Sequence, residues 1–142
     1  MSGNEKYDWT VILGGTNDIY NKKSKQRKSA EELTRNIISM HEIAWSHSSK
    51  TVAVTIPEVF CETQETCQDA KQLRERVNYD IRKYAYDHPE RIVLVDLADM
   101  LQRSNVGKDM IGQFFEGGLH LKPRGYERMA IIIYEGLKRA LS

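Results

Sequence analysis

The sequence contains only two cysteines, Cys61 and Cys67, among 142 residues. They form a single pair six positions apart, which does not match the ligand spacing of a zinc site. A scaffold held together by several disulfides is excluded as well, because such scaffolds need more cysteines in a short chain. Two free thiols or one local disulfide remain open, and the disulfide would require an oxidising compartment.

Long apolar runs and an excess of charge of one sign are also missing. No stretch reaches the roughly 18 apolar residues of a membrane-spanning helix, and the start, MSGNEKYDW, lacks the apolar core of a signal peptide. These absences predict a cytoplasmic protein, or a secreted one if the true start lies upstream. The formal net charge is +1, so overall charge gives no argument for a nucleic-acid partner.

Short apolar runs alternate with helical patterns along the chain. Runs rich in β-branched residues predict three strands, WTVIL at 9–13, TVAVTI at 51–56 and RIVLV at 91–95. Alternation of such strands with helices predicts an α/β fold with a parallel sheet. We see no linker or internal repeat, so residues 1–142 are interpreted as one domain.

Three long helices are expected between and after the strands. Ser29 and Glu32 form a capping box before the first, which runs to about residue 47, and Pro123 suits the first turn of the last. Residues 103–118 are expected to be mostly loop, after a short helical turn in DLADMLQ. The apolar faces of the three helices comprise Leu33, Ile37, Met40 and Ala44; Ala70, Leu73, Val77, Ile81 and Tyr84; and Tyr126, Met129, Ala130, Ile133, Leu137 and Leu141.

Two polar segments stand out against this pattern. In GGTND at 14–18, two glycines allow a sharp turn, and Asn17 and Asp18 either cap that turn or point into a site. In GLHLKPRGY, His120 directly precedes the last helix. Alone, His120 would more often be a surface histidine than a base, but it is well placed to reach the carboxyl ends of the strands, where parallel sheets hold their functional groups.

Together the two segments resemble the SGNH hydrolases, the GDSL-type esterases and lipases. TIPE at 55–58 and Asn78 in the second helix extend the resemblance over nearly the whole chain. The closest likeness is to small fungal and eukaryotic esterases of the isoamyl-acetate-hydrolysing type. The resemblance implies a three-layer α/β/α, flavodoxin-like SGNH hydrolase fold, hydrolysis of a small acyl or lipid ester, and no metal or cofactor.

The resemblance also implies roles for individual residues. Asn17 would donate its side-chain N–H to the oxyanion, and Gly15 opens the same oxyanion and substrate-binding motif. His120 would act as the general base that takes the proton of a serine. The acid that orients this histidine would lie three residues earlier, where the chain has Gly117, so Glu116 is the candidate that replaces it.

The family's nucleophile belongs to a G-D-S motif after the first strand of its fold, and no G-D-S occurs in these 142 residues. We therefore expect an N-terminally truncated domain with about three parallel strands. Covalent acyl transfer requires a nucleophile, which predicts that the isolated chain is inactive. The alternative is a non-catalytic truncated paralogue that serves as a binding or partner-association module.

The strand at 9–13 would pair with the missing first strand, so it is expected at an edge of the sheet. This edge, and a final helix left partly bare at Ile133, Leu137 and Leu141, predict a homodimer or a second chain that supplies the missing strand. Nucleic-acid binding by a basic loop is a weaker hypothesis, because no aromatic residues interleave with its cations. The cations of this loop are Lys22, Lys23, Lys25, Arg27 and Lys28.

Overall fold

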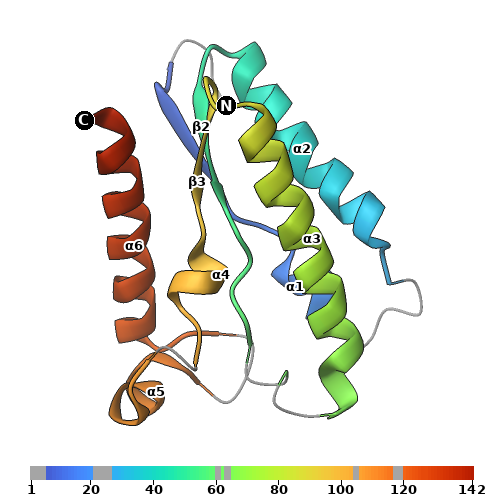
Figure 1. Cartoon of the computed structure of the whole chain (residues 1–142), viewed down its shortest axis with the longest axis vertical. Coiled ribbons are helices and arrows are strands. Elements are labelled where there is room, and N and C mark those ends of the chain that lie inside the picture. The colour runs from blue at the N-terminus through green and yellow to red at the C-terminus, as the bar shows by residue number, and fades with distance from the viewer. Residues whose placement is uncertain (1–5, 21–26, 60–61, 63–64, 104–105, 117–119) are drawn as a thin grey trace.

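The computed structural model describes residues 6–20, 27–59, 62, 65–103, 106–116 and 120–142. Strands and helices alternate through most of this part of the chain (Figure 1). In chain order they are β1 (Trp9–Ile12), α1 (Thr16–Tyr20), α2 (Ala30–Ser46), β2 (Lys50–Val54), the 3-10 turn η2 (Glu65–Cys67), α3 (Gln68–Asp87), β3 (Ile92–Val95), α4 (Leu97–Met100), α5 (Lys108–Phe114) and α6 (Pro123–Leu141).

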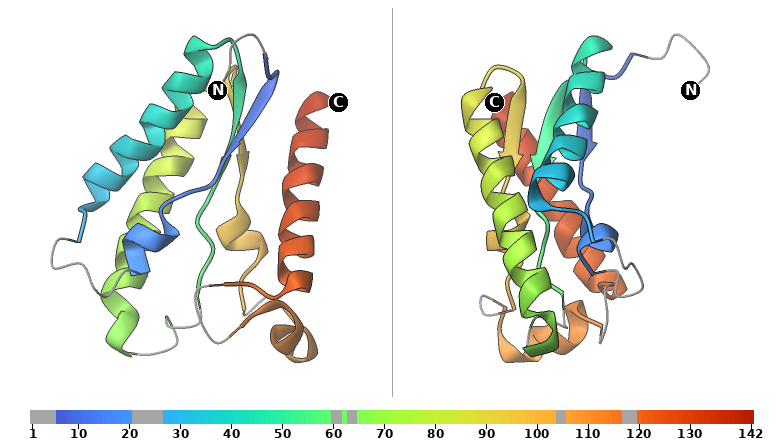
Figure 2. Two further views of the ribbon diagram at one scale, coloured as in Figure 1. Left: turned by 180° about the vertical axis from the view of Figure 1, so that it is seen from behind. Right: turned by 90° about the vertical axis from the view of Figure 1, so that its right-hand side faces the viewer.

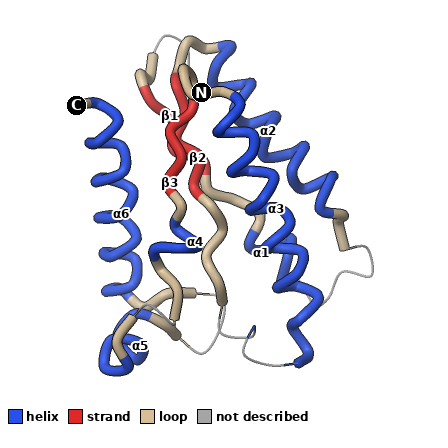
Figure 3. The backbone as a smooth tube through the Cα atoms, viewed as in Figure 1, coloured by secondary structure: helices blue, strands red, loops and turns tan. Residues whose placement is uncertain are grey.

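The three strands form a parallel sheet in the order β1-β2-β3 (Figure 3). Thr51 of β2 lies opposite Thr10 of β1 and Ile92 of β3, and the same register continues along each pair. The three strands predicted from the apolar runs are therefore confirmed. Among the described residues, β1 and β3 are the two edges of the sheet.

Helices cover both faces of this sheet (Figures 1 and 2). The pair α2 and α3 packs on one face, and α6 packs on the other. The prediction of an α/β fold with parallel strands and flanking helices is confirmed. The flavodoxin-like strand order involves strands that these residues do not contain, so it stays a prediction.

Strand β1 is less buried than the central strand, although its sequence is as apolar. Val11 is 46% exposed and Leu13 is 37% exposed, whereas Val52 of the central strand is fully buried. The reason is that α6 covers the β2 and β3 side of its face and leaves the β1 edge bare. Nearby on the other face, Met40 of α2 is 42% exposed, although its spacing predicted a core position.

Helix α6 is rotated relative to the expected apolar face. Ile132 is buried, Leu141 is 62% exposed, and Ile133 and Leu137 are half-buried. Ile133 and Leu137 pack against the core. Gly136 explains the rotation, because a Cβ added there would lie 2.6 Å from Cγ2 of Val95, so the helix approaches β3 through its glycine.

Two further expectations are corrected. Residues 108–114 were expected in a loop, yet they form α5, because Ile111 and Phe114 pack against the core beneath α6. Cys67 is disulfide-bonded, so a free thiol at this position is excluded, while Cys61 lies outside the described residues. None of the described helices combines the length and apolar character needed to cross a bilayer.

Candidate active site

The turn after β1 depends on Gly15. Its φ of 104° lies in the left-handed region that favours glycine, and an added Cβ would meet Cδ1 of Ile56 at 3.0 Å. Helix α1 begins immediately, with the N–H of Ile19 donating to the carbonyl oxygen of Gly15 at 3.0 Å. This turn brings Asn17 to the carboxyl end of the sheet, where its side chain is exposed.

The segment that carries His120 is held against α5. Phe115 and Leu121 form an antiparallel bridge, and the N–H of Lys122 donates to the carbonyl oxygen of Phe114 at 2.9 Å. Pro123 occupies the first turn of α6, as predicted, where its missing N–H has no cost. These contacts hold the chain on both sides of the histidine.

Gly125 makes this arrangement possible. A Cβ at this position would overlap the carbonyl oxygen of Phe114 and would lie 2.9 Å from Cβ of Leu121. The glycine of the sequence motif is therefore needed for the close approach of α6 to the end of α5. It determines where the segment preceding α6, and with it His120, can lie.

We expect Gly125→Ala to lower the free energy of unfolding by about 2 kcal/mol, because the added methyl group forces the backbone of α5 and α6 apart. Urea denaturation measures the change. The matched control is Gly112→Ala in α5, where an added Cβ meets nothing within 4 Å, so helix propensity should stabilise it by up to about 1 kcal/mol. Equal stabilities of the two variants would contradict the close approach.

Asn17 and His120 line one pocket of about 170 Å³. Leu13, Pro57, Glu58 and Met129 complete much of its wall, so the ends of β1 and β2 and the start of α6 meet here. Two segments that are separated by about 100 residues in sequence, GGTND and GLHLKPRGY, are thus brought to the same cavity.

Tyr126 is the described partner of His120, with its hydroxyl 3.5 Å from Nδ1 of the imidazole. No hydrogen bond or ion pair joins Glu116 to His120 within the described part of the chain, and Glu116 is exposed. Gly117 lies outside the described residues. Sequence reasoning assigned Tyr126 to the apolar face of α6 and missed its place beside the histidine. The signal in the sequence was that His120 lies just before Pro123, where the helix begins, and Tyr126 lies just after it.

Residues 2–128 match the GDSL-like lipase/acylhydrolase family. The chain belongs to this family. The match covers both motif segments and the strands between them. No curated protein sequence matches the chain. The narrower likeness to isoamyl-acetate-hydrolysing esterases stays a prediction.

Two solved structures are similar to the chain. A GDSL-like lipase from Bacteroides thetaiotaomicron is 24% identical, with a TM-score of 0.70 over 94% of this chain and 63% of that one. A structure named as an acylhydrolase from Bacteroides fragilis is 23% identical, with a TM-score of 0.69 over 95% and 63% of the two chains. At these identities the likeness shows the fold. The chain spans 63% of the length of each structure.

In this family member, the TIPE segment ties the ends of two strands together. The hydroxyl of Thr55 donates to Oδ1 of Asp96 at 2.8 Å and accepts from the N–H of Ala98 at 2.9 Å. Arg82 donates to both carboxylate oxygens of Asp96 at 2.8 Å. Burial raises the pKa of the Asp96 carboxyl, but the hydrogen bonds from Arg82 and Thr55 outweigh burial and hold this pKa below its usual value.

Asn78 of α3 extends the sheet where β2 has no further strand partner. Its side-chain oxygen accepts from the N–H of Ile56 at 2.8 Å, and its side-chain nitrogen donates to the carbonyl oxygen of Ile56 at 2.9 Å. Both groups are buried, so without Asn78 the N–H of Ile56 would lose its partner, and the carbonyl oxygen would keep only the 3.4 Å contact from Arg74. The asparagine therefore fixes the backbone just before Pro57 and Glu58 of the pocket.

The basic loop is described only in part, since Lys22, Lys23 and Lys25 lie outside the described residues. Lys28 forms an ion pair with Asp18 at 2.8 Å. This contact raises the pKa of Lys28, and it ties the start of α2 to the end of the GGTND segment. The described residues hold no group of three or more His, Cys, Asp and Glu side chains that could bind a metal ion.

Proposed function

We propose that the chain supplies the oxyanion-binding and general-base part of a GDSL-type ester hydrolase. Asn17 is the oxyanion donor and His120 is the base. The observation that supports this proposal is the shared pocket, which both side chains line although they come from opposite ends of the chain. The family match adds that the lineage is that of acylhydrolases.

In the proposed reaction, a serine hydroxyl attacks the carbonyl carbon of an ester, and His120 accepts the hydroxyl proton. The side-chain N–H of Asn17 donates to the oxyanion of the tetrahedral intermediate, in the manner of preorganised donors that contribute about 3–4 kcal/mol to the transition state. The imidazolium then gives its proton to the departing alkoxide as the C–O bond breaks. Water, deprotonated by the same imidazole, hydrolyses the acyl-serine.

Tyr126 is a candidate to orient His120 in place of an acid. Its hydroxyl can accept from the Nδ1–H of the imidazole, which would leave the Nε2 lone pair free to take a proton. The same role for Glu116 stays a prediction, because no described contact joins its carboxylate to the histidine. Gly15 contributes the turn that presents Asn17.

The nucleophile has to come from a segment with a different sequence. The 142 residues contain no G-D-S, and a second copy would contain none either, so a homodimer alone would not complete the site. The β1 edge is the candidate dock for a serine-bearing strand, because its backbone groups have no strand partner among the described residues. The missing motif also favours the second candidate function, a binding or partner-association module without catalysis.

We expect the 142-residue chain to hydrolyse p-nitrophenyl acetate no faster than its His120→Ala variant, because these residues contain no G-D-S serine. Spectrophotometry of released nitrophenolate measures this. A fluorophosphonate probe provides the control, since it labels activated serines and should not label this chain. Turnover that disappears in the variant, or labelling of one serine, would overturn the prediction.

The positive test is a chimera. A segment that carries a strand followed by G-D-S, as the family resemblance implies for the first strand of the fold, is fused ahead of residue 6 so that its strand can pair with β1. Hydrolysis should appear, and Asn17→Ala in the chimera should lower kcat about 100-fold or more, whereas Asn36→Ala, on the exposed surface of α2, should not. If the chimera folds and is labelled by the probe, but its kcat does not depend on Asn17, the proposed oxyanion role of Asn17 is wrong.

A further inference from the structure

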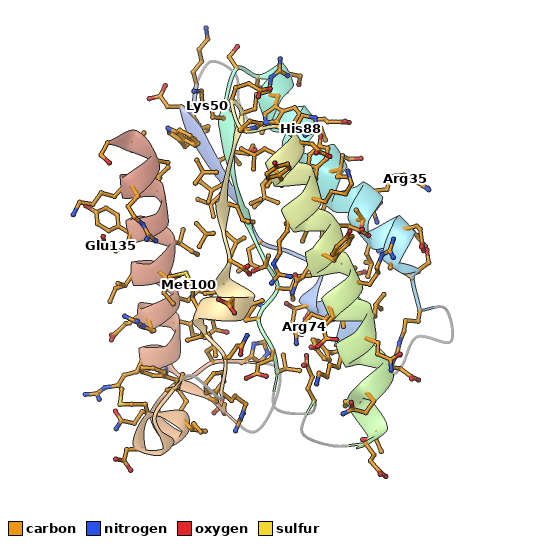
Figure 4. All side chains as sticks on the ribbon, viewed as in Figure 1. Arg35, Lys50, Arg74, His88, Met100 and Glu135 are labelled. Atoms are coloured by element: carbon orange, nitrogen blue, oxygen red, sulfur yellow. The ribbon has the colours of Figure 1, made fainter. Side chains whose placement is uncertain are left out.

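A second, larger cavity of about 400 Å³ lies between α3 and the segment that begins with α4. Apart from Ala98, every residue that lines it is polar or charged. Figure 4 shows Arg74 extending from α3 toward this region, on the side of the helix that faces the strand ends. A cavity with such a wall does not suit the acyl chain of a fatty ester, because burying methylene groups among charges has no favourable solvation term.

This polar cavity adjoins the Asn17–His120 pocket. Glu58 lines both cavities, so the two share part of their wall. Glu58 is itself held in place, because its carboxylate accepts from the backbone N–H of Arg103. The polar cavity therefore lies beside the pocket in which the ester carbonyl group would react.

Its two arginines are preorganised. Arg82 is held by Asp96 through two hydrogen bonds of 2.8 Å, and Arg74 is held by Glu62 through hydrogen bonds of 2.6 and 2.8 Å. Bidentate pairs of this kind fix the plane of the guanidinium group. A ligand would meet donors whose positions are already set, which lowers the conformational entropy lost on binding.

Lys71 and Glu75 add a donor and an acceptor that are not used elsewhere. The two residues are four positions apart on α3, so they share the face of the helix that lines the cavity. No ion pair or hydrogen bond engages either side chain within the described part of the chain. The ammonium group of Lys71 can donate a hydrogen bond to one hydroxyl group of a ligand, and the carboxylate of Glu75 can accept one from another.

Charges of both signs are close to balance around the cavity. The cations are Lys71, Arg74 and Arg82, and the carboxylates on the wall or directly behind it are Glu58, Glu62, Glu75 and Asp96. A net anion or cation would meet attraction and repulsion together. A neutral ligand with many hydroxyl groups would instead find alternating donors and acceptors.

We propose that the polar cavity binds a polyhydroxylated, sugar-like group, which forms the alcohol or acyl part of the ester that the adjoining pocket would cleave. The assignment to an ester rests on the proposed function. The binding itself does not, because it requires neither a serine nor turnover. A failure of catalysis and a failure of sugar binding are thus separate results.

The test is NMR titration of the ¹⁵N-labelled chain with D-glucose, D-xylose, hexanoate and inorganic phosphate, each alone. We expect either sugar to shift the amide signals of Glu75, Ala98 and Gln102 saturably. Lys71→Ala with Glu75→Ala should weaken that binding by about tenfold or more, as expected for loss of hydrogen bonds to charged groups. The control removes the exposed pair Glu135 and Lys138 of α6 in the same way and should leave affinity unchanged.

Each other result overturns the proposal. Shifts with phosphate and not with the sugars would mean an anion site, and shifts with hexanoate at these residues would mean an acyl-chain site. Sugar shifts that survive the Lys71 and Glu75 double substitution would place the binding elsewhere, and no shift with either sugar would mean that the cavity does not take such a ligand.

Discussion

Replacing Arg74 with leucine should lower the free energy of unfolding by about 3–5 kcal/mol, the cost of leaving a buried partner charge unpaired. Arg74 and Glu62 are 7% and 8% exposed, and two hydrogen bonds join them. Tyr20 at the end of α1 also donates to Glu62, and Arg74 reaches the carbonyl oxygen of Ile56 at 3.4 Å. The pair therefore joins α1, α3 and the end of β2 beneath the candidate site.

Urea denaturation of the variant measures this effect. The control is Lys83→Leu, which removes an exposed pair with Asp87 and should change stability by less than about 0.5 kcal/mol. A double variant, Arg74→Leu with Glu62→Leu, should be more stable than Arg74→Leu alone, because the lone charge is gone. If Arg74→Leu were no more harmful than the control, the pair would contribute little to the stability of this region.

Stability should also fall as the pH is lowered from about 6.5 to about 4, because of His41. This side chain is 1% exposed, and its Nδ1 lies 2.7 Å from the hydroxyl of Thr51, which also accepts from the indole N–H of Trp45 at 3.2 Å. Burial lowers the pKa of His41 to about 4. The folded protein thus holds this imidazole neutral.

The stability falls because the unfolded chain takes up a proton that the folded chain does not. Between pH 6.5 and 4 the unfolded chain protonates this histidine and the folded chain does not, so acid favours unfolding. The full loss, reached once the pH falls below the folded pKa, is about 3 kcal/mol. Asp96 also has a lowered pKa, but its contribution is lost only as the pH falls through 3.8 and below.

Denaturation in urea at several pH values measures this dependence, and His41→Gln should flatten it by about 3 kcal/mol across that range. His47→Gln provides the matched control, because His47 is exposed at the end of the same helix and its loss should leave the dependence unchanged. Parallel curves for the wild-type chain and His41→Gln would show that acid unfolding begins elsewhere.

The strands could be predicted from the sequence because β-branched runs such as 51–56 are buried by the helices on both faces, and burial on both faces gives a continuous apolar pattern. The face of α6 could be predicted in part, since Met129, Ile133 and Leu137 pack against the core as expected, but the close approach of Gly136 to β3 leaves no apolar pattern in the sequence. Met40 was predicted in the core and is exposed, whereas its neighbour His41, for which the pattern predicted nothing, is buried. His41 is polar and its partner Thr51 is distant in the pattern, so spacing alone cannot distinguish this buried histidine from a surface residue.

Asn17 and His120 were identified from the family resemblance, and the structure brings them to one pocket. Glu58 and Tyr126 were missed as lining residues, because their place depends on how β2 and α6 meet in space. The polar cavity beside them was missed as well. Its charged residues are spread along α3 at helical spacing, which in a sequence is typical of a solvated face.

The order of the strands in the sheet equals their order along the chain. Each strand pairs with the next; α1 and α2 connect β1 to β2, and η2 and α3 connect β2 to β3. Partners such as Thr10 and Thr51, or Thr51 and Ile92, are far apart in sequence, so the entropy of closing a long connection has to be lost before each pair forms, which slows the formation of parallel sheets. Of the three described strands, β2 has both of its neighbours, so its pairing is complete only after α3 and β3 have been synthesised as well.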